Sequence, residues 1–240
     1  MDRVSPTIRP RARVVGTQSW RKLLFLHWSF PPDVIRPLVP RSVELDLWEG
    51  RALVGVVPFA MRNIRPWWLP RVAAMDFLET NVRTYVHHRG GNPGVFFFSL
   101  EASSWLAVQA ARRGFGLPYF HANMTLEVRP DGSIRYETVR RGTLDAVHRV
   151  TYVPGEHLGA SPVGTLEHFL LERYLLYVER SGALFRGQVH HAPYPAQRAT
   201  VVEVRDGLMR AAGLPVVTGM PEYAHYAEGV DVEIFPLVRV

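Results

Sequence analysis

The chain has 240 residues, of which 47% are hydrophobic and 21% charged, values typical of one large globular domain or two small ones. It contains no cysteine, which excludes disulfides, thiolate nucleophiles and cysteine-ligated metal sites. Among its 28 basic residues only Lys22 is a lysine, so imine formation with a ketone has a single candidate residue.

The net charge of +6 invites a nucleic-acid interpretation, but the basic residues are dispersed. The closest pairs, Arg112-Arg113 and Arg140-Arg141, form no stripe, so nucleic-acid association is the least favoured alternative. The longest uncharged apolar run, Ala52 to Met61, is too short to cross a bilayer, and no membrane partner is expected. Residues 1–19 lack the apolar segment of a secretory signal. We expect them to form a flexible basic arm before a single domain of residues 20–240, in a cytoplasmic protein.

Short apolar or alternating runs between turn residues predict strands along most of the chain. In chain order they are Leu23–Phe30, Val43–Trp48, Ala52–Met61, Phe77–His87, Val95–Leu100, Phe120–Val128, Ile134–Val139, Val147–Val153, Leu184–His190, Arg198–Arg205 and Val230–Phe235. Pro130-Asp131-Gly132 predicts a hairpin, because glycine accepts positive φ and aspartate starts the turn.

Three helices interrupt these strands. The first opens at Pro31 and ends before Pro40, and the second runs from a cap at Ser103 or Ser104 to about Arg113. The third is predicted over Leu166–Arg180 after a Thr165 cap, because its apolar residues recur at helical spacing. Many strands with few helices predict a β-rich α+β fold, mainly antiparallel or a barrel.

The common catalytic motifs are absent: there is no G-x-S-x-G elbow, no Walker loop and no H-E-x-x-H. The ten histidines include two adjacent pairs, His87-His88 and His190-His191. Adjacent residues on a strand point to opposite faces, so each pair offers one ligand to a common site. Histidines hydrogen-bonded on a pocket wall are the favoured interpretation, and no metal or cofactor is predicted.

Motifs along nearly the whole chain from Trp20 resemble the YqjF-like uncharacterised family, known as domain of unknown function 2071. They are Trp20–Trp28, Pro32–Pro40, Val43–Asp46, Asn81–Val86, Gly94–Ala102, Gly116–Ala122, Leu166–Tyr174, His225-Tyr226 and Gly229–Glu233. The family as we know it has no established activity.

That family is in turn similar to acetoacetate decarboxylase, an antiparallel β-barrel around a hydrophobic cavity. The resemblance therefore implies an acetoacetate-decarboxylase-like antiparallel β-barrel with a few inserted helices. Gly116-Leu117-Pro118 is similar to the stretch before the imine-forming lysine of that enzyme, but here Tyr119 follows. Ser29 stands where the enzyme has an active-site arginine. With Lys22 expected on the surface, the chain, if it is an enzyme, is not a Schiff-base decarboxylase.

Strand parity suggests which polar residues share a face in such a barrel, because residues two apart point the same way. It groups His27 with Ser29, Asn81 with Arg83, Ser99 with Glu101, and Tyr119 with His121. We take His27, Tyr119 and Glu101 as candidate catalytic residues. The candidate ligand-binding residues are Ser29, Asn81, Arg83, Ser99 and His121.

Two functional hypotheses follow. In the first, the barrel binds a small, largely apolar organic acid or ketone and acts as a lysine-independent lyase or hydrolase, with histidine, carboxylate or tyrosine transferring the proton. In the second, it keeps the pocket as a non-catalytic binding or sensing protein, and either form could be a homo-oligomer. Simpler structural roles also stay open: Arg83 could pair with Glu79 across the sheet, and Tyr119 could be a core aromatic residue.

Overall fold

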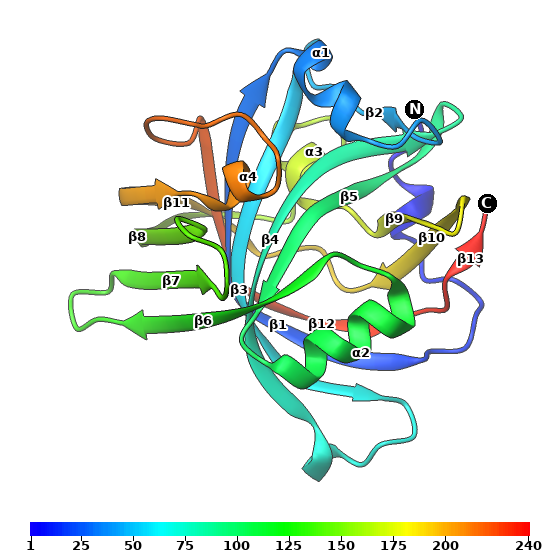
Figure 1. Cartoon of the computed structure of the whole chain (residues 1–240), viewed down its shortest axis with the longest axis horizontal. Coiled ribbons are helices and arrows are strands. Elements are labelled where there is room, and N and C mark those ends of the chain that lie inside the picture. Colours follow the sequence, from blue (N-terminus) through cyan, green and yellow to red (C-terminus); the bar gives the residue numbers. More distant parts are fainter.

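The computed structural model describes all residues 1–240, and β-strands dominate it (Figure 1). The strands are β1 (Gly16–Phe30), β2 (Glu44–Leu45), β3 (Ala52–Pro66), β4 (Met75–His88), β5 (Gly91–Ala102), β6 (Tyr119–Val128), β7 (Ile134–Arg140), β8 (Val147–Gly159), β9 (Leu175–Arg180), β10 (Ala183–His190), β11 (Ala196–Asp206), β12 (Tyr223–Ile234) and β13 (Val238–Arg239). The helices are α1 (Pro32–Ile35), α2 (Trp105–Phe115), α3 (Leu166–Leu171) and α4 (Leu208–Ala211), with 3₁₀ turns η1 (Ser5–Thr7), η2 (Arg36–Leu38) and η3 (Arg71–Ala73).

All thirteen strands belong to one sheet, in the order β13-β10-β9-β5-β6-β7-β8-β11-β12-β1-β3-β4-β2. Additional pairings of β4 with β5 and of β10 with β12 close this sheet into two rings. Both rings contain the run β12-β1-β3-β4-β5; β9 and β10 complete one of them, and β6, β7, β8 and β11 complete the other. The neighbours pair antiparallel except β5–β6 and β5–β9, which are parallel. The predicted β-rich, mainly antiparallel α+β class is confirmed.

Each ring encloses its own apolar core, and the shared strands contribute to both. On β1, Leu23 and Phe25 belong to the first core, whereas Leu24, Leu26 and Trp28 belong to the second. This division follows from strand geometry, because successive side chains point to opposite faces. A strand buried on both faces reads as an unbroken apolar run, as Ala52–Met61 of β3 does.

The predicted helix over Leu166–Arg180 is wrong in its second half. Helix α3 ends at Leu171, and β9 begins at Leu175. Strand β9 pairs in parallel with β5 and antiparallel with β10, and thereby joins the first ring. Its residues are largely buried on both faces, so its apolar run satisfies a helical pattern equally well. Tertiary pairing decides between the two.

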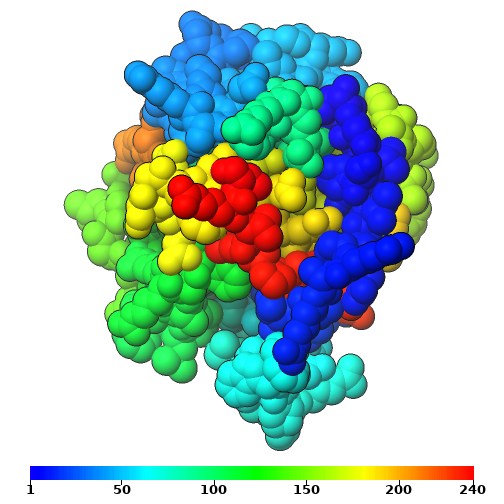
Figure 2. All heavy atoms as spheres, turned by 90° about the vertical axis from the view of Figure 1, so that its right-hand side faces the viewer, coloured from blue at the N-terminus to red at the C-terminus, as the bar shows by residue number.

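Residues 1–15, expected to belong to a flexible arm, lie along the surface beside the C-terminal segment (dark blue beside red in Figure 2). The guanidinium of Arg3 donates two hydrogen bonds to the Asp46 carboxylate, at 2.6 and 2.7 Å. Arg9 pairs with Glu233, and the Gln188 amide donates to main-chain carbonyls of this segment. Strand β1 begins at Gly16.

Candidate functional site

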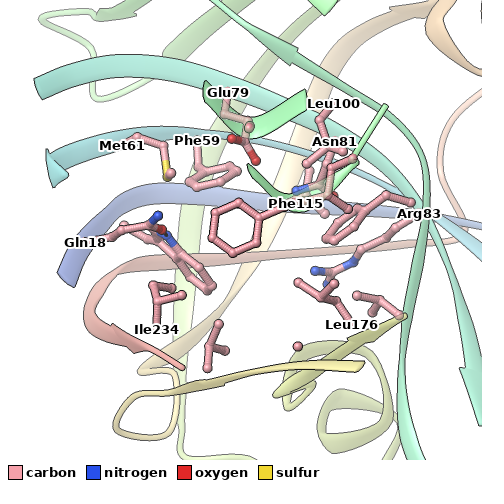
Figure 3. A pocket seen from close by; sticks show the side chains of 18 of the residues that line it. Gln18, Phe59, Met61, Glu79, Asn81, Arg83, Leu100, Phe115, Leu176 and Ile234 are labelled. Atoms are coloured by element: carbon pink, nitrogen blue, oxygen red, sulfur yellow. Dashed lines mark hydrogen bonds between the residues drawn. The ribbon is translucent and has the colours of Figure 1, made fainter. Parts of the chain in front are cut away.

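A cavity of about 270 Å³ lies inside the first ring (Figure 3). Of the 33 residues that line it, 26 are hydrophobic. The lining comes from β1, β3, β4, β5, β6, β9, β10, β12, α2 and the segments that connect them. Helix α2 covers one side, begins after a Ser104 cap and ends at Gly116, which adopts φ 70°. Its residues Ala107, Ala111 and Phe115 face the cavity. An apolar chamber with few polar groups is the usual form of a small-molecule site.

Three polar residues of β4, namely Glu79, Asn81 and Arg83, project into this chamber (Figure 3). They are two residues apart, so they share one face of the strand. On the opposite face Val82 belongs to the second apolar core, as parity predicted. Asn81 and Arg83 are thus placed in the cavity, and Glu79 joins them.

Glu79 and Tyr119 form a buried pair at one part of the wall. The Tyr119 hydroxyl donates to Glu79 Oε2 at 2.7 Å, and the Glu79 residue is 3% exposed. Burial raises the pKa of Glu79 to about 7, although the hydrogen bond from Tyr119 acts in the opposite direction. Burial, with the neighbouring Glu79 charge, holds the pKa of Tyr119 well above its usual value. A carboxyl group with a pKa near neutrality inside an apolar cavity is suited to general acid–base chemistry.

Arg83 is a buried cation without an ionic partner. It is 8% exposed, forms no salt bridge, and donates one hydrogen bond from Nη2 to the Leu170 carbonyl at 3.2 Å, while Nε has no acceptor. The alternative pairing of Arg83 with Glu79 is therefore not formed. Arg173 also lines the cavity, but it has an ionic partner in Asp46 at 2.7 Å, a carboxylate that it shares with Arg3. Burying a guanidinium without an ionic partner lowers the stability of the fold, and an anionic ligand that pairs with it would offset this penalty.

His27 lies outside the cavity lining, next to Tyr85. Its Nε2 is 2.6 Å from the Tyr85 hydroxyl, which donates to the Leu170 carbonyl at 2.9 Å. In this arrangement Nε2 carries the proton, and Nδ1 has no partner. Burial, reinforced by the Arg83 charge, holds the pKa of His27 well below its usual value, so the ring is neutral. His27 therefore contacts Tyr85 and is not among the residues that line the cavity.

Four other predicted site residues do not line the cavity. Ser99 and Glu101 share a face as expected, but it is the face of β5 opposite Leu100, which lines the cavity. There Glu101 accepts hydrogen bonds from Arg140, and burial raises its pKa against the effect of that cation. Ser29 bonds Glu222 near the surface, and His121 lies further along β6. Parity groups residues correctly here, but it does not say which face surrounds the chamber.

Two tyrosines and two glutamates of this region were not among the predicted site residues. Tyr174 and Tyr194 line the cavity, and the buried Glu172 holds both by accepting from the Tyr174 hydroxyl (2.7 Å) and the Tyr194 main-chain N–H (2.9 Å). Tyr174 was assigned to a helix, which hid its position. Glu79 carried a usable signal, because it has the same parity as Asn81 and Arg83.

Lys22 lies outside the chamber. Its Nζ is 3.1 Å from Glu228 Oε1, and its side chain is 31% exposed. No group of three or more histidine, aspartate or glutamate side chains is arranged to hold a metal ion. None of the helices has both the length and the apolar character that crossing a bilayer requires.

Comparison with solved structures shows the same fold in proteins of low sequence identity. An acetoacetate decarboxylase from Legionella pneumophila superposes with a TM-score of 0.64 at 12% identity, over 97% of this chain and 90% of that one. The enduracididine biosynthesis enzyme MppR, in complex with pyruvate, gives 0.63 at 11% identity, over 95% and 91%. The expected acetoacetate-decarboxylase-like fold is therefore confirmed.

Sequence comparison identifies the family. Uncharacterized protein YqjF of Bacillus subtilis (strain 168) is 36% identical over 221 residues, which are 92% of this chain and 90% of that protein. The model of a family described as "Uncharacterized conserved protein", domain of unknown function 2071, matches residues 17–231. The chain belongs to this DUF2071 family.

Proposed function

We propose that the cavity binds a small organic acid with a largely apolar body, a keto acid included, and that Arg83 receives its carboxylate. The observation that carries this proposal is a buried guanidinium with no ion pair in a chamber lined mainly by apolar side chains. The apolar wall would desolvate the body of the ligand, and the fork of Arg83 would neutralise its charge. One structural neighbour is described as a complex with pyruvate, a small carboxylic acid, which supports the ligand class.

In the catalytic form of this proposal, Glu79 and Tyr119 transfer the proton. With a pKa of about 7, Glu79 exchanges a proton near neutrality, and the Tyr119 hydroxyl is a fixed donor beside it. A ligand carboxylate bound to Arg83 would hold the rest of the ligand against Glu79 and Tyr119, because Arg83 and Glu79 lie on the same face of β4. The reaction class is a lysine-independent lyase or hydrolase. Lys22 takes no part, since it bonds Glu228 outside the chamber.

The experiment is a thermal-shift screen of small carboxylic acids and ketones, followed by calorimetric titration of the hits with four variants. Arg83→Met should weaken binding of a carboxylate at least about 30-fold, because removing a buried charge partner costs about 2 kcal/mol or more. Lys22→Met is the matched control for loss of one cation, and it should bind like the wild type. Equal affinity of Arg83→Met and the wild type would contradict the proposal.

Turnover of the bound acids separates catalysis from binding alone. In a catalyst, Glu79→Gln and Tyr119→Phe should abolish product formation while keeping much of the affinity. Binding without product in the wild type would instead favour a non-catalytic binding or sensing protein. The supporting observation for that second function is that Glu79 and Tyr119 already satisfy each other. The predicted cytoplasmic location and homo-oligomeric state stay predictions.

A further inference from the structure

The connection between β3 and β4 forms a hairpin that projects from the body of the protein. It comprises residues 62–76, including the end of β3, the 3₁₀ turn η3 and the start of β4. Figures 1 and 2 both show it in cyan at the lower end of the molecule, standing clear of the rings of strands. We call this segment the projecting hairpin.

The projecting hairpin exposes large apolar side chains at its end. Trp67 is 53% exposed, Trp68 65% and Val72 94%. Three large apolar residues that are more than half exposed lie on one projection, and exposed apolar patches mark sites of interaction. Tryptophan is characteristic of surfaces where an apolar and an aqueous phase meet, because its ring is apolar and its N–H is polar.

Arginines surround this apolar end. Arg62, Arg65 and Arg71 belong to the projecting hairpin. Arg62 lies 3.7 Å from Asp76, the one acidic residue of the hairpin, so Arg65 and Arg71 are its arginines without an ionic partner. The guanidinium carbon of Arg13, from the N-terminal segment, lies 3.7 Å from the centre of the Trp67 ring. Arg65 donates to the Leu69 carbonyl at 3.1 Å, which braces the turn. The projecting hairpin therefore has an apolar end with basic residues next to it.

The base of the projecting hairpin is part of the cavity wall. Ile64 pairs with Met75 where the two strands separate from the body, and both residues line the cavity. A surface that receives the hairpin would therefore lie beside the cavity. An apolar ligand dissolved in that surface would have a short path to the chamber.

We propose that the projecting hairpin docks this protein on an anionic phospholipid surface, with Trp67, Trp68 and Val72 entering the headgroup region. Arginines around an apolar end match such a surface, since anionic lipids attract basic residues and the apolar side chains enter the interface. A second copy of the chain is a poorer occupant, because each copy carries a net charge of +6 and would bring the same basic residues. Peripheral docking needs no spanning helix. The inference rests on the hairpin and not on the proposed function of the cavity.

The test is co-sedimentation of the full chain with vesicles of phosphatidylcholine alone or mixed with phosphatidylserine. We expect binding to the mixed vesicles, little binding to phosphatidylcholine alone, and release by high salt. Replacing Arg65 and Arg71 by glutamine should lower the partition coefficient about fivefold for each residue. Trp67→Ala and Trp68→Ala should each lower it by about tenfold or more.

Trp105→Ala is the matched control, because Trp105 is 56% exposed at the start of α2, outside the projecting hairpin. It should bind vesicles like the wild type, and an equal loss in this variant would overturn the assignment to the hairpin. Failure of the wild-type protein to bind mixed vesicles at low salt would overturn the proposal. Light scattering identifies the competing occupant: a wild-type dimer that Trp68→Ala dissociates, without vesicle binding, means that the hairpin joins two copies.

Discussion

Replacing Glu79 by glutamine should change how the stability of the protein depends on pH. Glu79 is 3% exposed and has no cationic partner, so its charged form is poorly solvated in the folded state. Burial raises its pKa from the usual 4.5 to about 7. Glutamine keeps the shape and an oxygen that can accept from the Tyr119 hydroxyl, but it does not ionise.

The direction in which stability changes with pH follows from how many protons the folded and the unfolded protein bind. Between pH 4.5 and pH 7 the folded protein keeps the Glu79 proton while the unfolded chain has lost it, so unfolding releases a proton and stability falls as pH rises. The difference between a pKa of 4.5 and one of about 7 corresponds to about 3 kcal/mol, at 1.36 kcal/mol for each factor of ten. This penalty is complete above pH 7 and absent below pH 4.5.

Urea unfolding of wild type and Glu79→Gln, measured from pH 4.5 to pH 8, tests this reasoning. Between pH 4.5 and pH 8 the free energy of unfolding of the variant should rise by about 3 kcal/mol relative to that of the wild type. Any effect of the substitution that does not depend on pH shifts the whole curve and leaves this difference unchanged. Glu127→Gln, which replaces an exposed carboxylate on β6, is the control and should follow the wild type. Parallel curves for Glu79→Gln and wild type would show that Glu79 is ionised in the fold and would refute the account of this pair.

Three further experiments test the packing of the second ring. Glu101→Gln alone should cost about 3–5 kcal/mol, because it leaves Arg140 buried without its partner, whereas Glu101→Leu combined with Arg140→Met should restore most of that stability in urea unfolding. Tyr136→Phe should cost about 1–3 kcal/mol by calorimetry, since its fully buried hydroxyl approaches two main-chain carbonyls; no change would mean that these contacts are not formed. Gly207→Ala should lower the melting temperature strongly, because its Cβ would clash with the main-chain carbonyl oxygen of Asp145.

Much of the strand framework could be predicted from the sequence, because alternation and turn residues act locally. The hairpin at Pro130-Asp131-Gly132 is one example: β6 and β7 pair directly across it. The segment Leu175–Arg180 could not be assigned in this way. Its apolar residues fit a helical stripe as well as a buried strand, and its parallel partner β5 lies far away in the sequence. The local signal was the turn at Ser181-Gly182, where both residues adopt positive φ and join Leu175–Arg180 to its antiparallel partner β10.

The candidate site was predicted in part, and the reason is geometric. Parity placed Asn81 and Arg83 together correctly on β4, and Tyr119 lines the same chamber. The same rule grouped Ser99 with Glu101 but could not show that their face belongs to the second core. In a sheet that closes into two rings both faces are buried, so polarity no longer distinguishes the cavity side from the other.

The most direct test of the central claim is a crystal structure of the protein with the tightest-binding carboxylic acid from the screen. We expect the carboxylate of the ligand on the Arg83 guanidinium, its apolar body against Phe115 and Leu176, and its remaining polar atoms toward Glu79 and Tyr119. A ligand bound outside the chamber, or one inside it whose carboxylate avoids Arg83, would contradict the account.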